Sequence, residues 1–282
     1  MGATFVVTLR EGFEAALLLG IVYAFLAQTP LRRHHTWVTG GAVLGLVASG
    51  LLGVVVSFAS GPLLDIGPDL IAAAIMLVAV AFLTWHAWWM RQHARAISGD
   101  VHRQIEAVRT TGKLSALAVI AFTAVFREGA ETVLFLWGLM TQVPMSGASG
   151  LLGAAGGIVT AAILGWLVFT GGRRIPVRRF FAVTTVLLVL VAAGLLASSI
   201  ARLDGLGYVP STLTLWDTSW FLEEKSGVGG FLAGLVGYRS RPTLLEAGAW
   251  LVYLVLAGAL LWRPTRARRP SAQAPAAELT SR

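Results

Sequence analysis

Long apolar stretches alternate along the chain with short polar segments that are rich in arginine. A membrane-spanning helix needs about 20 mostly apolar residues, and seven stretches meet that length. They cover residues 3–27, 37–59, 69–90, 114–139, 150–170, 180–201 and 245–262. The pattern predicts an all-α integral membrane protein with seven transmembrane helices in a single domain over residues 1–262.

Three polar segments complete this predicted organisation. Residues 91–113 are cationic and long enough for a surface helix, and residues 202–244 form the largest loop. Within that loop, residues 228–238 are apolar but too short to span a bilayer, which predicts an interfacial or re-entrant helix. Residues 263–282 are rich in Pro, Ala and Arg, a composition typical of a disordered basic tail.

The basic residues are distributed unequally between the two sets of loops. Most of the 22 Lys and Arg residues lie in the segments 28–36, 91–113 and 171–179 and in the tail, and only a few lie in residues 202–244. Cytoplasmic loops carry the excess of Lys and Arg. The sequence therefore predicts an N-terminus outside the cell, a C-terminus inside, and a cytoplasmic tail.

Composition narrows the class further. The chain has 282 residues, of which 56% are hydrophobic and 13% are charged, and it has no cysteine. Soluble domains carry about 25% charged residues, so a polytopic membrane protein is favoured. The net charge of +8 belongs to the loops and is not accompanied by a nucleic-acid motif. Disulfides and thiolate metal sites are excluded.

A five-residue motif occurs twice within the apolar stretches. Residues 10–14 read Arg-Glu-Gly-Phe-Glu, and residues 127–131 read Arg-Glu-Gly-Ala-Glu. An ionisable side chain at membrane depth costs about 2.5–3.5 kcal/mol on insertion scales, and such residues usually face a protein interior or a water-filled path. The repeated motif is therefore the candidate functional site.

The positions of the two motifs predict an inverted repeat. Three spans separate them, so span 1 runs inward and span 4 runs outward, and residues 3–90 and 114–201 form two inverted three-helix repeats followed by a seventh helix. Gly41-x-x-x-Gly45 in span 2 has a counterpart in Gly153-x-x-x-Gly157 in span 5, and such small-residue faces permit close helix packing. Inverted repeats place the substrate near the midplane, between the repeats.

Helical spacing predicts the geometry within each motif. Residues three and four apart share a helix face, so Glu11 and Glu14 lie together, as do Glu128 and Glu131 on the other helix. The same rule pairs Arg10 with Glu14. It also pairs Arg127 with Glu131.

Antiparallel crossing predicts how the two motifs meet. Glu11 would lie level with Glu131, and Glu14 with Glu128. Gly12 and Gly129 remove side-chain bulk beside the carboxylates, which would let the two helices approach each other.

Four carboxylates and two guanidinium groups at one place favour a cation site. Carboxylates that close cannot all remain ionised without a cation, so metal binding would release protons. Oxygen ligands favour hard cations: ferric iron suits the set, while ferrous iron, Mn, Mg and Ca remain open. The absence of Cys and of a clustered His set argues against copper(I) or zinc.

Other functions have weaker support in the sequence. The arginines could be structural partners of the carboxylates, and the whole protein could be a non-transporting structural or sensor subunit. Diiron catalysis would require Glu-x-x-His pairs and a zinc protease His-Glu-x-x-His; the sequence contains neither. Transport of another cation, such as lead or manganese, would use the same site geometry.

The two Arg-Glu-Gly-x-Glu motifs resemble those of the oxidase-dependent iron permease family, which includes the fungal high-affinity iron permeases and the bacterial EfeU-type iron uptake permeases. The loop sequence Trp-Asp-Thr-Ser-Trp at 216–220 is similar to the bacterial branch. The resemblance implies a permease that moves iron across the cytoplasmic membrane into the cell, with iron as substrate and no tightly bound cofactor.

The resemblance also implies residue roles and partners. The metal ligands would be Glu11, Glu14, Glu128 and Glu131, in a site structured by Arg10, Arg127, Gly12 and Gly129. Fungal members use a multicopper oxidase, and bacterial members are associated with a periplasmic cupredoxin-type protein and a haem peroxidase. The acidic Glu-x-x-Glu loop elements of the fungal members are missing from this chain.

Several other polar residues are candidates for the entrance or exit of the path. In the outer loops these are Asp65, Asp69, Asp217, Glu223 and Glu224, which are predicted to be solvated charges or to attract cations. His86 stands among three tryptophans near the inner end of span 3. It is expected in an interfacial aromatic belt, with an exit-side ligand role as the alternative.

Overall fold

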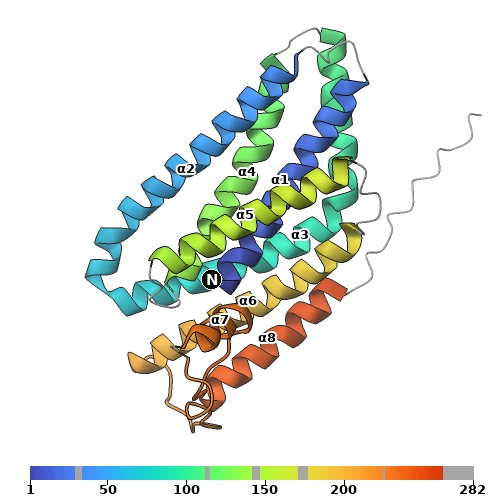
Figure 1. Ribbon diagram of the computed structural model, residues 1–282. Coiled ribbons are helices and arrows are strands. Elements are labelled where there is room, and N and C mark those ends of the chain that lie inside the picture. Colours follow the sequence, from blue (N-terminus) through green and yellow to red (C-terminus); the bar gives the residue numbers. More distant parts are fainter. Residues whose placement is uncertain (29–33, 112–114, 142–146, 171–176, 225, 263–282) are drawn as a thin grey trace, which may run out of the picture.

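The computed structural model describes residues 1–28, 34–111, 115–141, 147–170, 177–224 and 226–262, and these residues are almost entirely helical (Figure 1). The helices are α1 (Gly2–Ala27), α2 (His35–Ile66), α3 (Pro68–Thr111), α4 (Ser115–Met140), α5 (Gly147–Thr170), α6 (Val177–Gly205), α7 (Gly227–Val236) and α8 (Leu244–Trp262). The all-α prediction is confirmed, and each of the seven apolar stretches coincides with one long helix.

Among the described residues, five helical segments are long and apolar enough to cross a membrane: His35–Ala59, Pro68–Gln92, Ser149–Thr170, Val177–Gly205 and Leu244–Trp262. Helices α1 and α4 are each 26 residues long and also mostly apolar. They differ from the five because each contains the three ionisable residues of one motif. The chain is thus a multi-pass membrane protein, and the count of seven spans stays a prediction.

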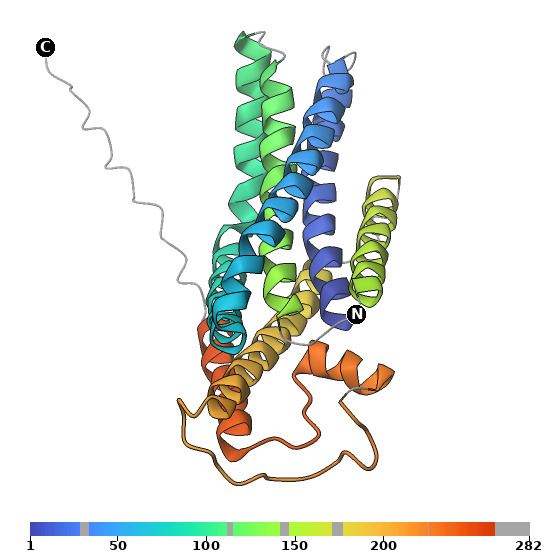
Figure 2. The same cartoon turned by 90° about the vertical axis from the view of Figure 1, so that its left-hand side faces the viewer.

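The two motif helices lie at the centre of the bundle. Helix α1 packs against α4 and α5, α2 packs against α4, and α3 packs against α6. Figures 1 and 2 show α1 and α4 side by side and running in opposite directions. The main hydrophobic core lies between α1, α3, α4 and α6, with Phe135 and Met76 among its fully buried side chains.

Glycines allow α2 and α5 to approach the motif helices, as their spacing predicts. A Cβ at Gly45 would lie 2.8 Å from the Phe122 carbonyl oxygen of α4, and one at Gly157 would lie 2.6 Å from the Phe5 carbonyl oxygen of α1. Phe122 and Phe5 stand at the same distance before Arg127 and Arg10, respectively. The α2–α4 and α1–α5 packings therefore use matching positions.

The helices of the first half are longer than the sequence indicates. Helix α2 continues to Ile66 and α3 begins at Pro68, so the expected outer loop between spans 2 and 3 is reduced to the junction at Gly67. At its other end, α3 continues through residues 91–111, which replaces the expected separate surface helix. Polar residues end an apolar stretch but do not end a helix when no capping residue or proline follows.

The described residues between α6 and α8, which the loop charges predict to lie outside the membrane, form an extended segment that is called the outer segment below. Its short helix α7 matches the helix expected within residues 228–238, begins after the N-cap Ser226 and ends at Gly237, which has a φ of 73°. Phe231 of α7 packs over Gly2, so α7 lies across the start of α1. The predicted tail, residues 263–282, lies outside the described residues.

Candidate functional site

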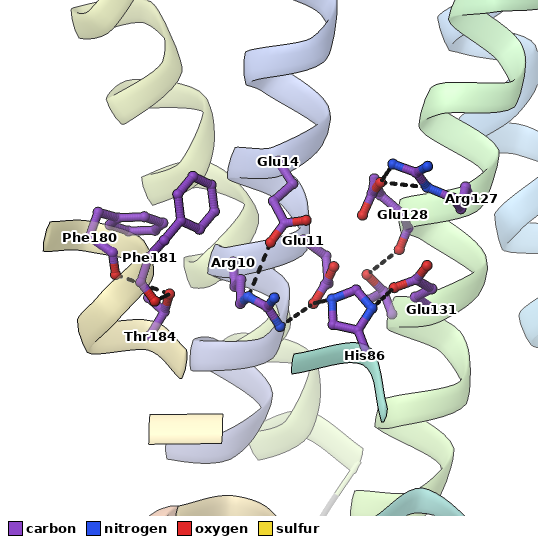
Figure 3. A network of polar contacts seen from close by, with 11 residues as sticks. Arg10, Glu11, Glu14, His86, Arg127, Glu128, Glu131, Phe180, Phe181 and Thr184 are labelled. Atoms are coloured by element: carbon purple, nitrogen blue, oxygen red, sulfur yellow. Dashed lines mark hydrogen bonds and ion pairs between the residues drawn. The ribbon is translucent and has the colours of Figure 1, made fainter. Parts of the chain in front are cut away.

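The motif side chains meet where α1 and α4 face each other, in the interior of the bundle (Figure 3). Glu11, Glu14 and Glu128 are 1%, 4% and 2% exposed. The side chain of Glu131 is 15% exposed. Such burial of carboxylates is costly unless each is paired or coordinates a cation, so the partners of each one matter.

Arg10 neutralises part of the charge on α1. Its Nε lies 3.1 Å from Oε1 of Glu14, and its Nη1 lies 3.5 Å from Oε1 of Glu11. The pairing of Arg10 with Glu14, expected from their i, i+4 spacing, is confirmed. A single buried guanidinium thus contacts both carboxylates of its own motif.

The expected pairing of Arg127 with Glu131 is wrong. Arg127 donates from Nε and Nη2 to Oε1 of Glu128, at 2.9 and 2.5 Å. The Arg127 side chain is 42% exposed and lies over the ring of Trp89 from α3. Glu131 instead meets a residue of α3, and helical spacing within α4 does not reveal that third helix.

That residue is His86, and its expected place in an interfacial aromatic belt is wrong. His86 is 2% exposed. Its Nδ1 lies 2.5 Å from Oε2 of Glu131, and its Nε2 lies 3.9 Å from Oε1 of Glu11. Figure 3 shows the imidazole between the two motif helices. Helix α3 continues past the end of its apolar stretch to Thr111. A position near the end of that stretch therefore does not place His86 outside the site.

These contacts indicate which carboxylates lie at the same level, that is, at the same height along the axes of α1 and α4. His86 reaches both Glu11 and Glu131, so these two lie at the same level, as antiparallel helices predict. In Figure 3, Glu14 on α1 and Glu128 on α4 are drawn at similar heights, above the imidazole of His86.

The motif glycines do not lie between α1 and α4, where they were expected to let the two helices approach each other. A Cβ at Gly12 would lie 3.0 Å from Cβ of Ala161 on α5, and one at Gly129 would overlap the side chain of Ser49 on α2. The glycines face α5 and α2 because the carboxylates occupy the opposite faces of the same helices. They position the site by letting the outer helices press against the motif helices.

In the part of the chain that the structure describes, two overlapping groups of side chains could hold a cation. Glu11, Glu14 and His86 form one, and Glu11, Glu128 and Glu131 form the other; in each group the ligand atoms lie within 4.8 Å of one another. Oε2 of Glu11, Oε2 of Glu14 and Oε2 of Glu128 are buried without a hydrogen-bond partner, and Oε1 of Glu14 makes an ion-pair contact with Arg10 but no hydrogen bond. Buried carboxylate oxygens without a hydrogen-bond partner are typical of a site that binds a cation.

Four of the remaining acidic candidates, Asp69, Asp217, Glu223 and Glu224, belong to neither group, and the side chain of Asp65 lies outside the described part of the structure. Asp69 pairs with Arg202 at 2.5 Å, and Arg202 also donates to the Thr141 carbonyl oxygen at 2.6 Å, so this aspartate ties α3 to α6 and α4. Asp65 lies in the last turn of α2. Glu223 and Glu224 lie in the segment before α7.

Asp217 is bound within the outer segment. Its carboxylate accepts hydrogen bonds from the Ser219 hydroxyl at 2.6 Å and the Ser219 amide at 3.0 Å, and Nε of Arg241 lies 3.0 Å away. These hydrogen bonds, with the arginine, lower the pKa of Asp217 to about 2. The residue is therefore an ionised structural contact of the loop.

Comparisons with known proteins match nearly the whole chain. The sequence model described as "Iron permease FTR1 family" matches residues 1–267. The chain is 31% identical over 270 residues to the "Ferrous iron permease EfeU" of Escherichia coli O6:H1, covering 95% of this chain and 97% of that protein. It is 30% identical over 282 residues to the protein of the same name from Yersinia pestis, covering 99% of both. No solved structure matches.

Proposed function

Because the chain belongs to the iron permease FTR1 family, we propose that iron crosses the membrane through the buried cluster of Glu11, Glu14, Glu128 and Glu131. The family consists of transporters rather than enzymes, and the chain is accordingly a multi-pass membrane permease for iron. The proposal concerns which residues hold the ion and how they do so.

The main support for this proposal is that several carboxylate oxygens are buried without a hydrogen-bond partner where α1 faces α4. Glu11 belongs to both groups of potential ligands, so an ion could pass from one group to the other without losing this carboxylate. Two arginines balance part of the negative charge, and a cation would balance the rest. A carboxylate cluster of this kind replaces the water shell of a hard or borderline cation.

Ferrous iron is the proposed cargo. The relatives in Escherichia coli and Yersinia pestis are named ferrous iron permeases. Oxygen ligands alone suit ferric iron equally well, but an imidazole beside the carboxylates suits Fe²⁺. Glu128 and Glu131 would receive the ion on α4, and Glu11 and Glu14 on α1.

The membrane arrangement of this proposal is two inverted repeats, α1–α3 and α4–α6, followed by α8. Support comes from the matched glycine contacts of α2 with α4 and of α5 with α1. Further support comes from the antiparallel course of α1 and α4 (Figure 2). The excess of basic residues in the segments 28–36, 91–113 and 171–179 supports an outside N-terminus. The periplasmic partners implied by the family resemblance stay a prediction.

The test is uptake of Fe²⁺ by the purified chain in liposomes under anaerobic conditions. Glu11→Gln and Glu128→Gln keep the side-chain shape but remove a negative charge from the cluster. Each variant is expected to lose nearly all uptake while remaining a monodisperse protein. Fe³⁺, Mn²⁺ and Pb²⁺, tested in parallel, would show whether another cation is the true cargo.

Glu246→Gln is the matched control, because Glu246 is also buried, at 4% exposure, but pairs with Arg239 in the outer part of the bundle. This control is expected to transport iron. Normal uptake by both cluster variants would refute the assigned path, whereas absence of metal binding and uptake in the unmodified chain would favour a structural or sensor subunit.

A further inference from the structure

Among the described residues of the cluster, His86 supplies the one nitrogen that could bind a metal ion. It comes from α3, whereas the motif carboxylates come from α1 and α4. With 2% of its surface exposed, it is as deeply buried as Glu11, Glu14 and Glu128. Its two nitrogens have different surroundings, and this difference indicates what the residue does.

Nδ1 of His86 is held by α4. It lies 2.5 Å from Oε2 of Glu131, an ion-pair contact that does not have hydrogen-bond geometry. In a neutral imidazole a carboxylate this close favours a hydrogen on Nδ1 and leaves the lone pair on Nε2. A carboxylate that holds one imidazole nitrogen while the other faces a metal is the usual support of a histidine ligand.

Nε2 of His86 is directed at the carboxylates of α1. It lies 3.9 Å from Oε1 of Glu11, and it is buried without a hydrogen-bond partner. His86, Glu11 and Glu14 can bring their ligand atoms within 4.8 Å of one another. A lone pair that faces two carboxylates is unfavourable unless a cation lies between them.

We propose that His86 is a direct iron ligand through Nε2 and that it makes the site select a transition metal over Mg²⁺ and Ca²⁺. This proposal rests on the proposed function and adds a chemical basis for the selectivity of the site for iron. Carboxylate ligands alone suit Mg²⁺, Ca²⁺ and Mn²⁺, whereas imidazole suits iron and other transition metals. One nitrogen donor in this set therefore excludes the most abundant divalent competitors.

The arrangement also divides the cluster into two ion positions that share Glu11. One position has imidazole and the carboxylates of α1, and the other has the carboxylates of Glu11 and α4. In the first position Glu131 acts through His86, by holding its ring.

The first test measures equilibrium binding of Fe²⁺, Mg²⁺ and Ca²⁺ by the full chain in detergent. His86→Gln is expected to weaken Fe²⁺ binding by about ten- to a hundredfold while leaving Mg²⁺ and Ca²⁺ binding nearly unchanged. His35→Gln is the matched control, since His35 is exposed at the start of α2. An unaltered preference for Fe²⁺ over Mg²⁺ in His86→Gln would overturn the proposal.

The second test replaces the nitrogen donor with a sulfur donor. The chain has no cysteine, so His86→Cys introduces its single thiol. A thiolate selects soft metals; the variant is therefore expected to bind Cd²⁺ with a thiolate charge-transfer absorption, and Cd²⁺ should block its iron uptake. His35→Cys should show no such block. Should His86→Gln fail to purify as a monodisperse protein, the Cd²⁺ result decides.

The outcomes separate this inference from the proposed function. If the unmodified chain neither binds nor transports Fe²⁺, the proposed function fails. If the unmodified chain transports Fe²⁺, but His86→Gln keeps the metal preference and His86→Cys is insensitive to Cd²⁺, only the role of His86 fails.

Discussion

Arg10 and Arg127 occupy the same position in the two motifs, but the Arg10 side chain is 1% exposed and the Arg127 side chain is 42% exposed. Arg10 contacts both glutamates of its motif, while Arg127 contacts Glu128. Equivalent positions in the sequence therefore have unequal environments, and the cluster is closed on the α1 side and more open on the α4 side.

The first prediction concerns the stability that each arginine provides. Arg10→Gln leaves two buried carboxylates without their shared cation, and breaking a buried ion pair typically costs about 3–5 kcal/mol. Arg127→Gln removes a partly exposed cation that contacts one carboxylate, so a smaller loss than for Arg10→Gln is expected. Thermal unfolding of the purified variants should show a clearly larger loss for Arg10→Gln. Equal losses would contradict the difference in burial.

The second prediction compares two adjacent glycines of α2. A Cβ at Gly41 would overlap the backbone of Ala118 on α4, whereas a Cβ at Gly40 has nothing within 4 Å. Gly41→Ala should therefore separate α2 from α4 and lower the unfolding temperature. Gly40→Ala should be neutral or stabilise by up to about 1 kcal/mol, because alanine favours the helix.

Gly40→Ala also serves as the control for the cost of changing a glycine in this part of the helix. If Gly41→Ala unfolds at the same temperature as Gly40→Ala, the close approach of α2 to α4 is wrong.

Much of this arrangement follows from local sequence patterns. Apolar length predicted each long helix, the i, i+4 rule predicted the contact of Arg10 with Glu14, and small-residue spacing predicted the close faces of α2 and α5. Each of these predictions depends on spacing within one helix, or on matching positions in two helices. The rules behind them relate residues that are close in the sequence, so they can be applied without the structure.

The errors share a different cause. The contact of His86 with Glu131 depends on where α3 crosses α4, and Trp89, over which Arg127 lies, also belongs to α3. Helical periodicity does not determine that crossing. His86 also follows Trp85, which supports an interfacial position by composition alone. The one available signal was a histidine with no neighbouring charge within an apolar stretch, a residue type that is rare at membrane depth unless it is functional.

The third prediction concerns the pH dependence of uptake. The pKa of Asp217 is lowered to about 2, so the contribution of its ionised form is present above the usual aspartate pKa and is lost only as the pH falls toward about 2. Between about pH 5 and about pH 7 this contact does not titrate. Asp217→Asn should therefore leave the shape of the Fe²⁺ uptake profile unchanged over that range.

Initial uptake rates in proteoliposomes, measured at several external pH values for both proteins, test this directly. A profile that flattens in Asp217→Asn would assign the pH dependence to the outer segment. An unchanged profile is the expected result and excludes Asp217 as the source of the pH dependence.

The fourth prediction concerns orientation in the membrane. The excess of basic residues on one side predicts that the segment containing Leu213 faces outward and that Gln92, at the inner end of the α3 span, faces the cytoplasm. Leu213 is 82% exposed, and the chain has no cysteine of its own, so Leu213→Cys and Gln92→Cys each provide a single labelling site. A membrane-impermeant maleimide should label Leu213→Cys in spheroplasts and Gln92→Cys only in inside-out vesicles. Both variants should retain iron uptake, and the reverse labelling pattern would invert the proposed direction of α1 and α4 and with it the side from which iron reaches Glu11 and Glu131.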